Sequence, residues 1–173
     1  MAGGYAIELA VGQPFREHEN MDVLILRRDQ AALRRLLAEW DCRPVDPEGL
    51  LRSWAPDAIL PLHVHDVWCR EGTDAPWRFS LLIDEADGDM WYARRDSTVR
   101  KPLADLTARQ PGTPPFLAPD IQLYHKAKHL RAKDEQDLDM ALPILTARQR
   151  RWLAEAVYRT YGAEHPWLAR IDG

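Results

Sequence analysis

The sequence has few cysteines, no long hydrophobic run and no excess of positive charge, and each absence excludes a class of protein. Cys42 and Cys69 are its two cysteines, without CxxC spacing, which excludes a disulfide framework and favours a reducing compartment. No apolar run approaches the roughly 20 residues that a membrane span needs, and the first residues do not read as a signal peptide. We therefore expect a cytoplasmic protein without a membrane partner.

Charge and composition point to a small-molecule ligand. The net charge is −4 and the pI is about 5.9, so the chain lacks the basic footprint of a nucleic-acid-binding protein. With 173 residues, 46% hydrophobic and 29% charged, it is long enough for one compact domain with its own core. No internal repeat divides it.

The first two thirds read as an α/β unit. We expect a helix over residues 5–11, ended by Gly12 and Pro14, and a helix capped by Asp29 that runs to about Trp40 with four arginines on its exposed side, Arg27, Arg28, Arg34 and Arg35. The predicted strands are Met21–Leu26, an edge strand around Leu50 to Trp54, Leu62–Cys69, Trp77–Asp84 and Met90–Arg94, the last two joined as a hairpin by a turn over residues 84–89.

The last third reads as helical. Residues 107–118, rich in Pro and Gly, are predicted to be a surface linker between a core over 1–106 and helices over 119–173. Pro119 suits a first helical position, a second helix is expected from Asp134 to Leu145, and Thr146 with Gln149 has the form of a capping box that opens a third.

The pattern with chemical content lies near the N-terminus. Gly3 and Gly4 open a short helix, and glycines at a helix N-terminus let a phosphate approach free backbone N–H groups. Asn20 and Asp22 are two positions apart on the following strand, so their side chains leave the same face and can share one cation.

This order of segments resembles the DNA polymerase β-like nucleotidyltransferases, in the small branch that includes aminoglycoside and lincosamide nucleotidyltransferases. The resemblance extends from Gly3 to His165-Pro166-Trp167-Leu168. It implies a mixed β-sheet flanked by helices, an α/β (α+β) fold without the family's leading helix and strand, followed by a helical C-terminal part. It also implies Mg²⁺-dependent transfer of a nucleoside monophosphate from an NTP to a hydroxyl of a small molecule.

The resemblance assigns roles to particular residues. Asp22 and Asn20 take the catalytic metal-binding positions, and Ser80 takes the position of a third metal-binding carboxylate. Because Asn20 and Ser80 are not acidic, the alternative is a non-catalytic descendant that binds a nucleotide or a partner. Asp84 shares the strand parity of Ser80, but a hairpin-turn aspartate is the simpler interpretation.

The remaining nucleotide-binding candidates are basic. Arg16 and His18 match an Arg-x-His turn of the family, and a surface arginine that balances Glu17 and Glu19 is an equal alternative for Arg16. Lys126 is the expected phosphate contact, and Lys133 with Asp134 is expected to hold the back half on the front half.

Three further expectations concern other residues. His63 and His65 share a strand face, but an HxH pair alone is a weak metal signal. Tryptophans such as Trp68 and Trp167 are interpreted as packing residues. Without the family's leading elements, Ile7, Leu9 and Val11 should leave an apolar surface that favours a homodimer.

Overall fold

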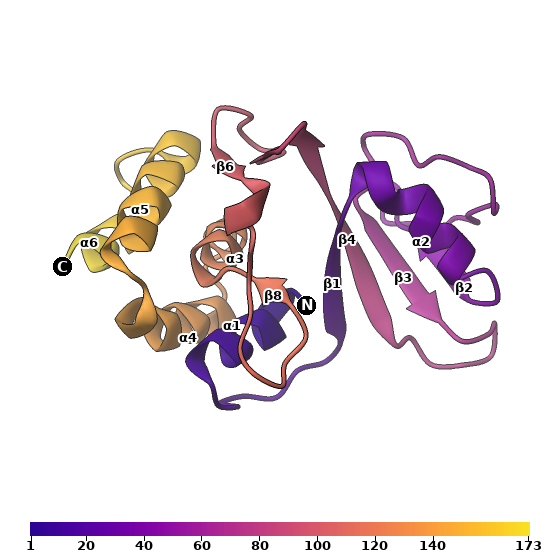
Figure 1. Cartoon of the computed structure of the whole chain (residues 1–173), viewed down its shortest axis with the longest axis horizontal. Helices are drawn as coiled ribbons and strands as arrows, with labels where there is room; N and C mark the ends of the chain where they lie inside the picture. Colours follow the sequence, from indigo (N-terminus) through magenta and orange to yellow (C-terminus); the bar gives the residue numbers. More distant parts are fainter.

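The chain folds into a mixed α+β structure with a mostly antiparallel sheet on one side and a group of helices on the other (Figure 1). The computed structural model describes residues 1–173, apart from the side chain of residue 172. In the part of the chain that the structure describes, no helix is both long and apolar enough to cross a membrane.

The sheet follows the order β2-β3-β4-β5-β6, and β1 pairs with β4. Its strands are β1 Met21–Leu26, β2 Asp41–Pro44, β3 Asp66–Arg70, β4 Phe79–Asp87, β5 Met90–Tyr92 and β6 Arg100–Pro102. The β1–β4 pair is parallel and sets Asp22 opposite Ser80, whereas the other pairs in the sheet are antiparallel. The long strand β4 therefore holds β1 and β3 beside its first half and β5 beside its second half.

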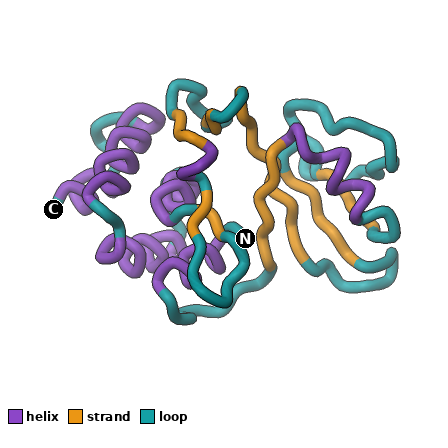
Figure 2. The backbone as a smooth tube through the Cα atoms, in the orientation of Figure 1, coloured by secondary structure: helices purple, strands orange, loops and turns teal.

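The helices gather on the opposite side from β2 and β3, as the tube in Figure 2 shows. They are α1 Gly3–Val11, α2 Gln30–Leu36, α3 Pro119–Lys126, α4 Ala132–Ala141, α5 Ala147–Tyr161 and α6 Trp167–Asp172; α2 alone lies with the sheet (Figure 1). A separate two-stranded sheet pairs β7 Thr107–Ala108 with β8 Phe116–Leu117. Short 3₁₀ turns cover Arg27–Asp29, Leu103–Asp105 and Leu142–Ile144.

Strand β1 joins two hydrophobic cores because its side chains alternate between the faces of the sheet. Val23 and Ile25 pack into the core under α2, which includes Leu81 and Ile83 of β4. Leu24 and Leu26 pack instead against the core built by α1, α3, α4 and α5. The continuous apolar run of this strand thus reflects burial on both faces, as predicted.

Several local predictions are confirmed. Strand Met21–Leu26 has the predicted bounds. Helix α1 ends at Gly12, whose φ of 87° lies in the left-handed region that glycine tolerates. Pro119 occupies the first turn of α3, and Thr146 and Gln149 form the reciprocal capping box that starts α5.

The helix after β1 differs from its prediction. It ends at Leu36, and the side chain of Asp29 does not cap it. Arg34 is buried rather than exposed, and its guanidinium donates hydrogen bonds to the carbonyl oxygens of Leu37 and Trp54. Leu36 is 79% exposed instead. Arg34 thus satisfies carbonyls where the helix ends, a role that its place in a run of arginines did not reveal.

Two predicted strands are displaced. The edge strand is β2, Asp41–Pro44, while Leu51 makes only an isolated bridge with Val45. Proline at the last position of an edge strand costs little, so the prolines of this region did not exclude a strand there. Strand β4 continues to Asp87, and the predicted turn over residues 84–89 is therefore only Gly88 and Asp89.

The expected linker and second C-terminal helix also differ. Phe116 and Leu117 of the 107–118 segment are buried in the helical core, so this segment packs on the core and is more than a surface connection. Helix α4 begins at Ala132 and ends at Ala141, because Pro143 confines the following residues to a 3₁₀ turn.

The expected apolar surface on α1 is not present. Ile7 is fully buried, and Leu9 and Val11 are half-buried against the helical core. α1 packs directly on α3, α4 and β8, which cover its apolar face. The premise of the homodimer prediction is therefore wrong, because these residues do not form an exposed apolar surface through which two copies could associate.

Candidate functional site

A polar cavity of about 290 Å³ lies where β1 begins, on the sheet face that α1 and α3 adjoin. Eight of the nine predicted site residues line it, and the ninth, Gly3, lies directly behind Asp22. The lining consists of Gly4, Arg16, His18, Glu19, Asn20, Asp22, Asp66, Trp68, Ser80, Leu82, Lys126, Arg131 and Lys133. Segments more than 100 residues apart in the sequence thus contribute to one site.

The glycine pair lets α1 approach the start of β1. The backbone N–H of Ala2 donates to the carbonyl oxygen of Asp22, with an N–O distance of 2.8 Å. Gly3 has a φ of 66°, and a Cβ at this position would overlap the Asp22 carboxylate. A Cβ at Gly4 would overlap Arg16 and His18. Both glycines are therefore required by close packing around the site.

Asp22 is a half-buried carboxylate without a partner. Among the residues that the structure describes, no group donates a hydrogen bond to its side chain and no cation lies within ion-pair distance. Burial raises the pKa of Asp22, although the charges of Lys126 and Lys133 oppose that effect. An acceptor of this kind, open to a cavity, suits a cation or a hydrogen-bond donor.

Ser80 lies opposite Asp22 on β4, whereas Asn20 lies in the bend just before β1 and not on the strand where the sequence placed it. Ser80 faces Asp22 across the β1–β4 pair and is buried, whereas Asn20 is exposed. The Nδ2 of Asn20 donates to Ser80 Oγ at 3.4 Å. The two uncharged residues therefore contact each other at the positions where the resemblance expects carboxylates.

Besides Asp22 and the exposed Glu19, the cavity contains a carboxylate that sequence reasoning missed, that of Asp66. It comes from β3, pairs in register with Leu82, and its Oδ1 is a buried atom without a hydrogen-bond partner. Burial is the main cause that raises the pKa of Asp66, and the nearby charge of Asp22 adds to it. The alternation of Asp66, Val67 and Trp68 was the signal that this side chain shares a face with Ser80.

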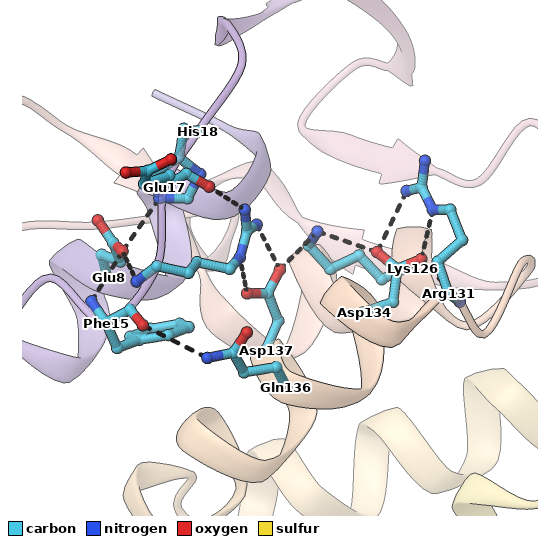
Figure 3. Close-up of polar contacts among 10 residues, drawn as sticks. Glu8, Phe15, Glu17, His18, Lys126, Arg131, Asp134, Gln136 and Asp137 are labelled. Carbon is cyan, nitrogen blue, oxygen red and sulfur yellow. Dashed lines mark hydrogen bonds and ion pairs between the residues drawn. The ribbon is translucent and has the colours of Figure 1, made fainter.

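The basic residues of the cavity are anchored from behind by two fully buried aspartates (Figure 3). Arg16 makes a bidentate pair with Asp137, at 2.7 and 2.9 Å. Lys126 Nζ lies 2.7 Å from Asp137 Oδ2 and 3.2 Å from Asp134 Oδ1, and Arg131 also pairs with Asp134. Arg16 is therefore part of a buried ion-pair network rather than a balance for Glu17 and Glu19.

The other basic candidates are held differently. Lys133 is half-buried and lies 3.7 Å from the exposed Glu19, so its ion pair with the front half of the chain is weak. The two halves are joined by the pair between Arg16 and Asp137, and not by Lys133 with Asp134 as predicted. His18 Nε2 lies 3.0 Å from Glu8 Oε1 outside hydrogen-bond geometry, and its ring packs on Tyr5. His18 thus braces the turn that carries Arg16.

The donor set fits one hard cation but not a three-carboxylate centre. Among the described residues, no group of three His, Cys, Asp or Glu side chains is arranged to hold a metal ion. Mg²⁺ commonly uses only one or two carboxylates and takes its other ligands from phosphates and water. Asp22 meets that smaller requirement, and Asn20 lines the same cavity.

Two other expectations concern the histidine pair and the tryptophans. His63 is exposed and His65 half-buried, and no further ligand completes a metal site around them in the described residues. Trp167 is fully buried, as predicted, but Trp68 is 37% exposed and lines the cavity. Trp68 packs edge-on against Trp77, which holds it at the rim.

Asp84 is neither a turn residue nor a lining residue of the cavity. It is 2% exposed on β4 and accepts hydrogen bonds from Trp91 Nε1 at 2.8 Å and Arg94 Nε at 3.2 Å. His125 Nε2, from α3, lies 3.3 Å from Oδ2, the oxygen that also accepts from Trp91. Burial alone would raise the pKa of Asp84, but the charge and contact of His125, with Trp91 and Arg94, lower it to about 2.

This lowered pKa predicts a specific loss of stability in acid. The unfolded chain binds a proton on Asp84 near pH 3.8, whereas the folded protein resists protonation down to about pH 2. The stabilisation from Asp84 is therefore complete above about pH 5 and falls by about 2 kcal/mol as the pH approaches 2. Urea unfolding should show the difference between the wild type and Asp84→Asn shrinking over this range. Asp89→Asn, an exposed change in the same hairpin, should follow the wild type at every pH; a constant difference for Asp84→Asn would contradict the prediction.

Comparison with known proteins provides no relative: no protein-family model matches the chain, and no curated protein matches it either.

Proposed function

We propose that the chain is a nucleotidyltransferase-like protein whose cavity binds an NTP with Mg²⁺ and transfers a nucleoside monophosphate to a hydroxyl of a small molecule. The observation that carries the proposal is the unpartnered Asp22 carboxylate against the glycine-rich start of α1, in one cavity with Arg16, Lys126 and Lys133. The mixed sheet flanked by helices agrees with such a fold.

In this proposal the chain's residues bind and orient rather than react. Lys126 and Lys133 face the triphosphate, and Asp134 and Asp137 fix the position of Lys126. Mg²⁺ bound by Asp22 and Asn20 would neutralise phosphate charge. No side-chain nucleophile is needed, because the oxygen of an acceptor hydroxyl bonds to the α-phosphorus, the bond to pyrophosphate breaks, and the hydroxyl proton passes to water.

A non-catalytic nucleotide-binding protein is the second candidate, and the contact between Asn20 and Ser80 favours it. An active three-carboxylate site would have negatively charged side chains at positions 20 and 80, where this chain has two uncharged side chains that hydrogen-bond to each other. In this case the cavity binds an NTP through its basic residues, and the binding depends little on Mg²⁺.

A thermal-shift titration with ATP, GTP, CTP and UTP, each with and without Mg²⁺, tests the proposal. At 100 times the Kd, one NTP should raise the melting temperature by roughly 5–10 °C, since binding to the folded state stabilises it by mass action. Asp22→Asn should remove the Mg²⁺-dependent part of the shift. The exposed Asp89→Asn is the control with the same charge change and should keep the full shift.

The outcomes separate the two candidates. An Mg²⁺-dependent shift with release of pyrophosphate in the presence of an acceptor supports the transferase, and a shift that is independent of Mg²⁺ supports the non-catalytic protein. No shift with any NTP would overturn both.

A further inference from the structure

A second cavity, of about 550 Å³, is lined by residues that neighbour the lining of the first cavity along the chain. His65 lines the second cavity and the next residue, Asp66, lines the first; Lys128 lines the second, two positions after Lys126, which lines the first. None of the proposed NTP-binding residues belongs to the second cavity. It is therefore a separate compartment next to the position proposed for the triphosphate.

The second cavity carries a positive charge that the protein does not neutralise. Arg95 and Lys128 are exposed, and neither has a carboxylate partner among the side chains that the structure describes. Arg94 donates a hydrogen bond to Asp84 through Nε alone, so its two terminal nitrogens take no part in that contact. Glu85 is the one acidic residue that lines this cavity, and its carboxylate is paired with Arg27.

This charge is unusual in its context, because the whole chain has a net charge of −4. Three unpaired or half-paired cations around one cavity repel one another and cost stability unless an anion joins them. Arginine in particular binds carboxylate and phosphate groups through two parallel hydrogen bonds.

The remaining lining residues suit an organic anion larger than a single ion. His65 has a buried Nδ1 without a hydrogen-bond partner, and burial together with the charge of Arg94 lowers its pKa, which keeps the ring neutral near pH 7. Tyr92 contributes an aromatic ring, and the exposed Leu62 an apolar edge. Neutral, aromatic and apolar groups of this kind contact the uncharged part of a ligand.

We propose that this second cavity binds the acidic group of the acceptor, so that the acceptor is a hydroxylated organic anion, a carboxylate or a phosphate ester. The identification of the ligand as the acceptor rests on the proposed function. Anion binding at Arg94, Arg95 and Lys128 does not depend on it. A polyamine acceptor is disfavoured, because an ammonium group in this cavity would meet three cations.

NMR titration with inorganic phosphate and, separately, with acetate tests the site without nucleotide or Mg²⁺. The backbone amides of residues 94, 95 and 128 should shift with saturation, and the probe that binds more tightly tells a phosphate ester from a carboxylate. In the double variant Arg95→Gln, Lys128→Gln the apparent affinity should fall about tenfold or more, because charge-assisted hydrogen bonds are lost.

The matched control is Arg109→Gln, Arg151→Gln, which removes the same charge from two other exposed arginines that make no ion pair among the described side chains. It should leave phosphate and acetate binding unchanged. If neither probe shifts residues 94, 95 and 128, or if the control loses as much affinity as the test variant, the anion site is rejected.

Two measurements keep this inference apart from the proposed function. Mg²⁺·NTP affinity should change less than about threefold in Arg95→Gln, Lys128→Gln; a tenfold loss would assign the cavity to the triphosphate and overturn the acceptor assignment. If the anions bind here but no NTP binds to the wild type, the proposed function fails while the anion site stands.

Discussion

Replacing Asp137 with alanine should lower the free energy of unfolding by about 3–5 kcal/mol. The carboxylate is fully buried and receives both Arg16 and Lys126, so its removal leaves two cations close together without their common partner. Urea unfolding at pH 7 measures the change, and the slope with denaturant shows whether the transition stays cooperative.

Asp139→Ala is the matched control on the same helix. Asp139 also pairs with an arginine, Arg170, but its side chain is 69% exposed and Arg170 keeps a second carboxylate, Glu135. An exposed pair of this kind contributes about 0–1 kcal/mol, so the two variants should differ by several kcal/mol. Equal losses would mean that Asp137 is not the residue that joins the two halves of the molecule.

The double change Asn20→Asp, Ser80→Asp should strengthen Mg²⁺-dependent NTP binding by well over tenfold, since about 1.4 kcal/mol already gives a factor of ten. Both positions lie beside Asp22, and Ser80 faces it across the β1–β4 pair. The metal-free double variant should unfold more easily than the wild type, because three close carboxylates repel one another and raise each other's pKa. Calorimetry with each NTP and urea unfolding with EDTA measure the two effects.

The control for this variant is Gln13→Glu, Ser97→Asp, which adds the same charge at two exposed positions away from the cavity. It should change neither NTP affinity nor metal-free stability by a comparable amount. A folded Asn20→Asp, Ser80→Asp protein that binds Mg²⁺·NTP no better than the wild type would show that the cavity is not built for this chemistry, and the resemblance would then concern the fold alone.

The sequence predicted those parts of the fold that depend on local patterns. The apolar run of β1, the capping box of α5 and the glycine at the end of α1 are each determined by residues within a few positions. The bounds of α2 and β2 depend on tertiary contacts: Arg34 is buried because carbonyl groups of Leu37 and Trp54 need a donor. Periodicity contains no information about such a partner.

In the candidate site, too, the residues found from the sequence are those marked by a local pattern, and the residues missed depend on tertiary contacts. Asp22, Asn20 and the glycines were found because a glycine pair and two-residue spacing at the start of a predicted strand are visible in the sequence, although Asn20 itself lies in the bend before β1. Asp66 was missed because its place in the cavity depends on the register of β3 with β4. Asp137 was missed because its partner Arg16 lies 121 residues away, and one sequence does not reveal which of 27 acidic residues meets a given arginine.

The pairing of the first residues with the last third also determines when the chain can fold during its synthesis. Gly3 bonds to Gln122 and Arg16 to Asp137, with sequence separations of 119 and 121 residues. At ribosomal rates of about 5–20 residues per second, α1 waits roughly 6–24 s for the segment that covers it. During that time Ile7 and its apolar neighbours are exposed in the nascent chain. Closing such long loops is slow even in the released chain, so we expect folding to be limited by the docking of α1 on α3 and α4.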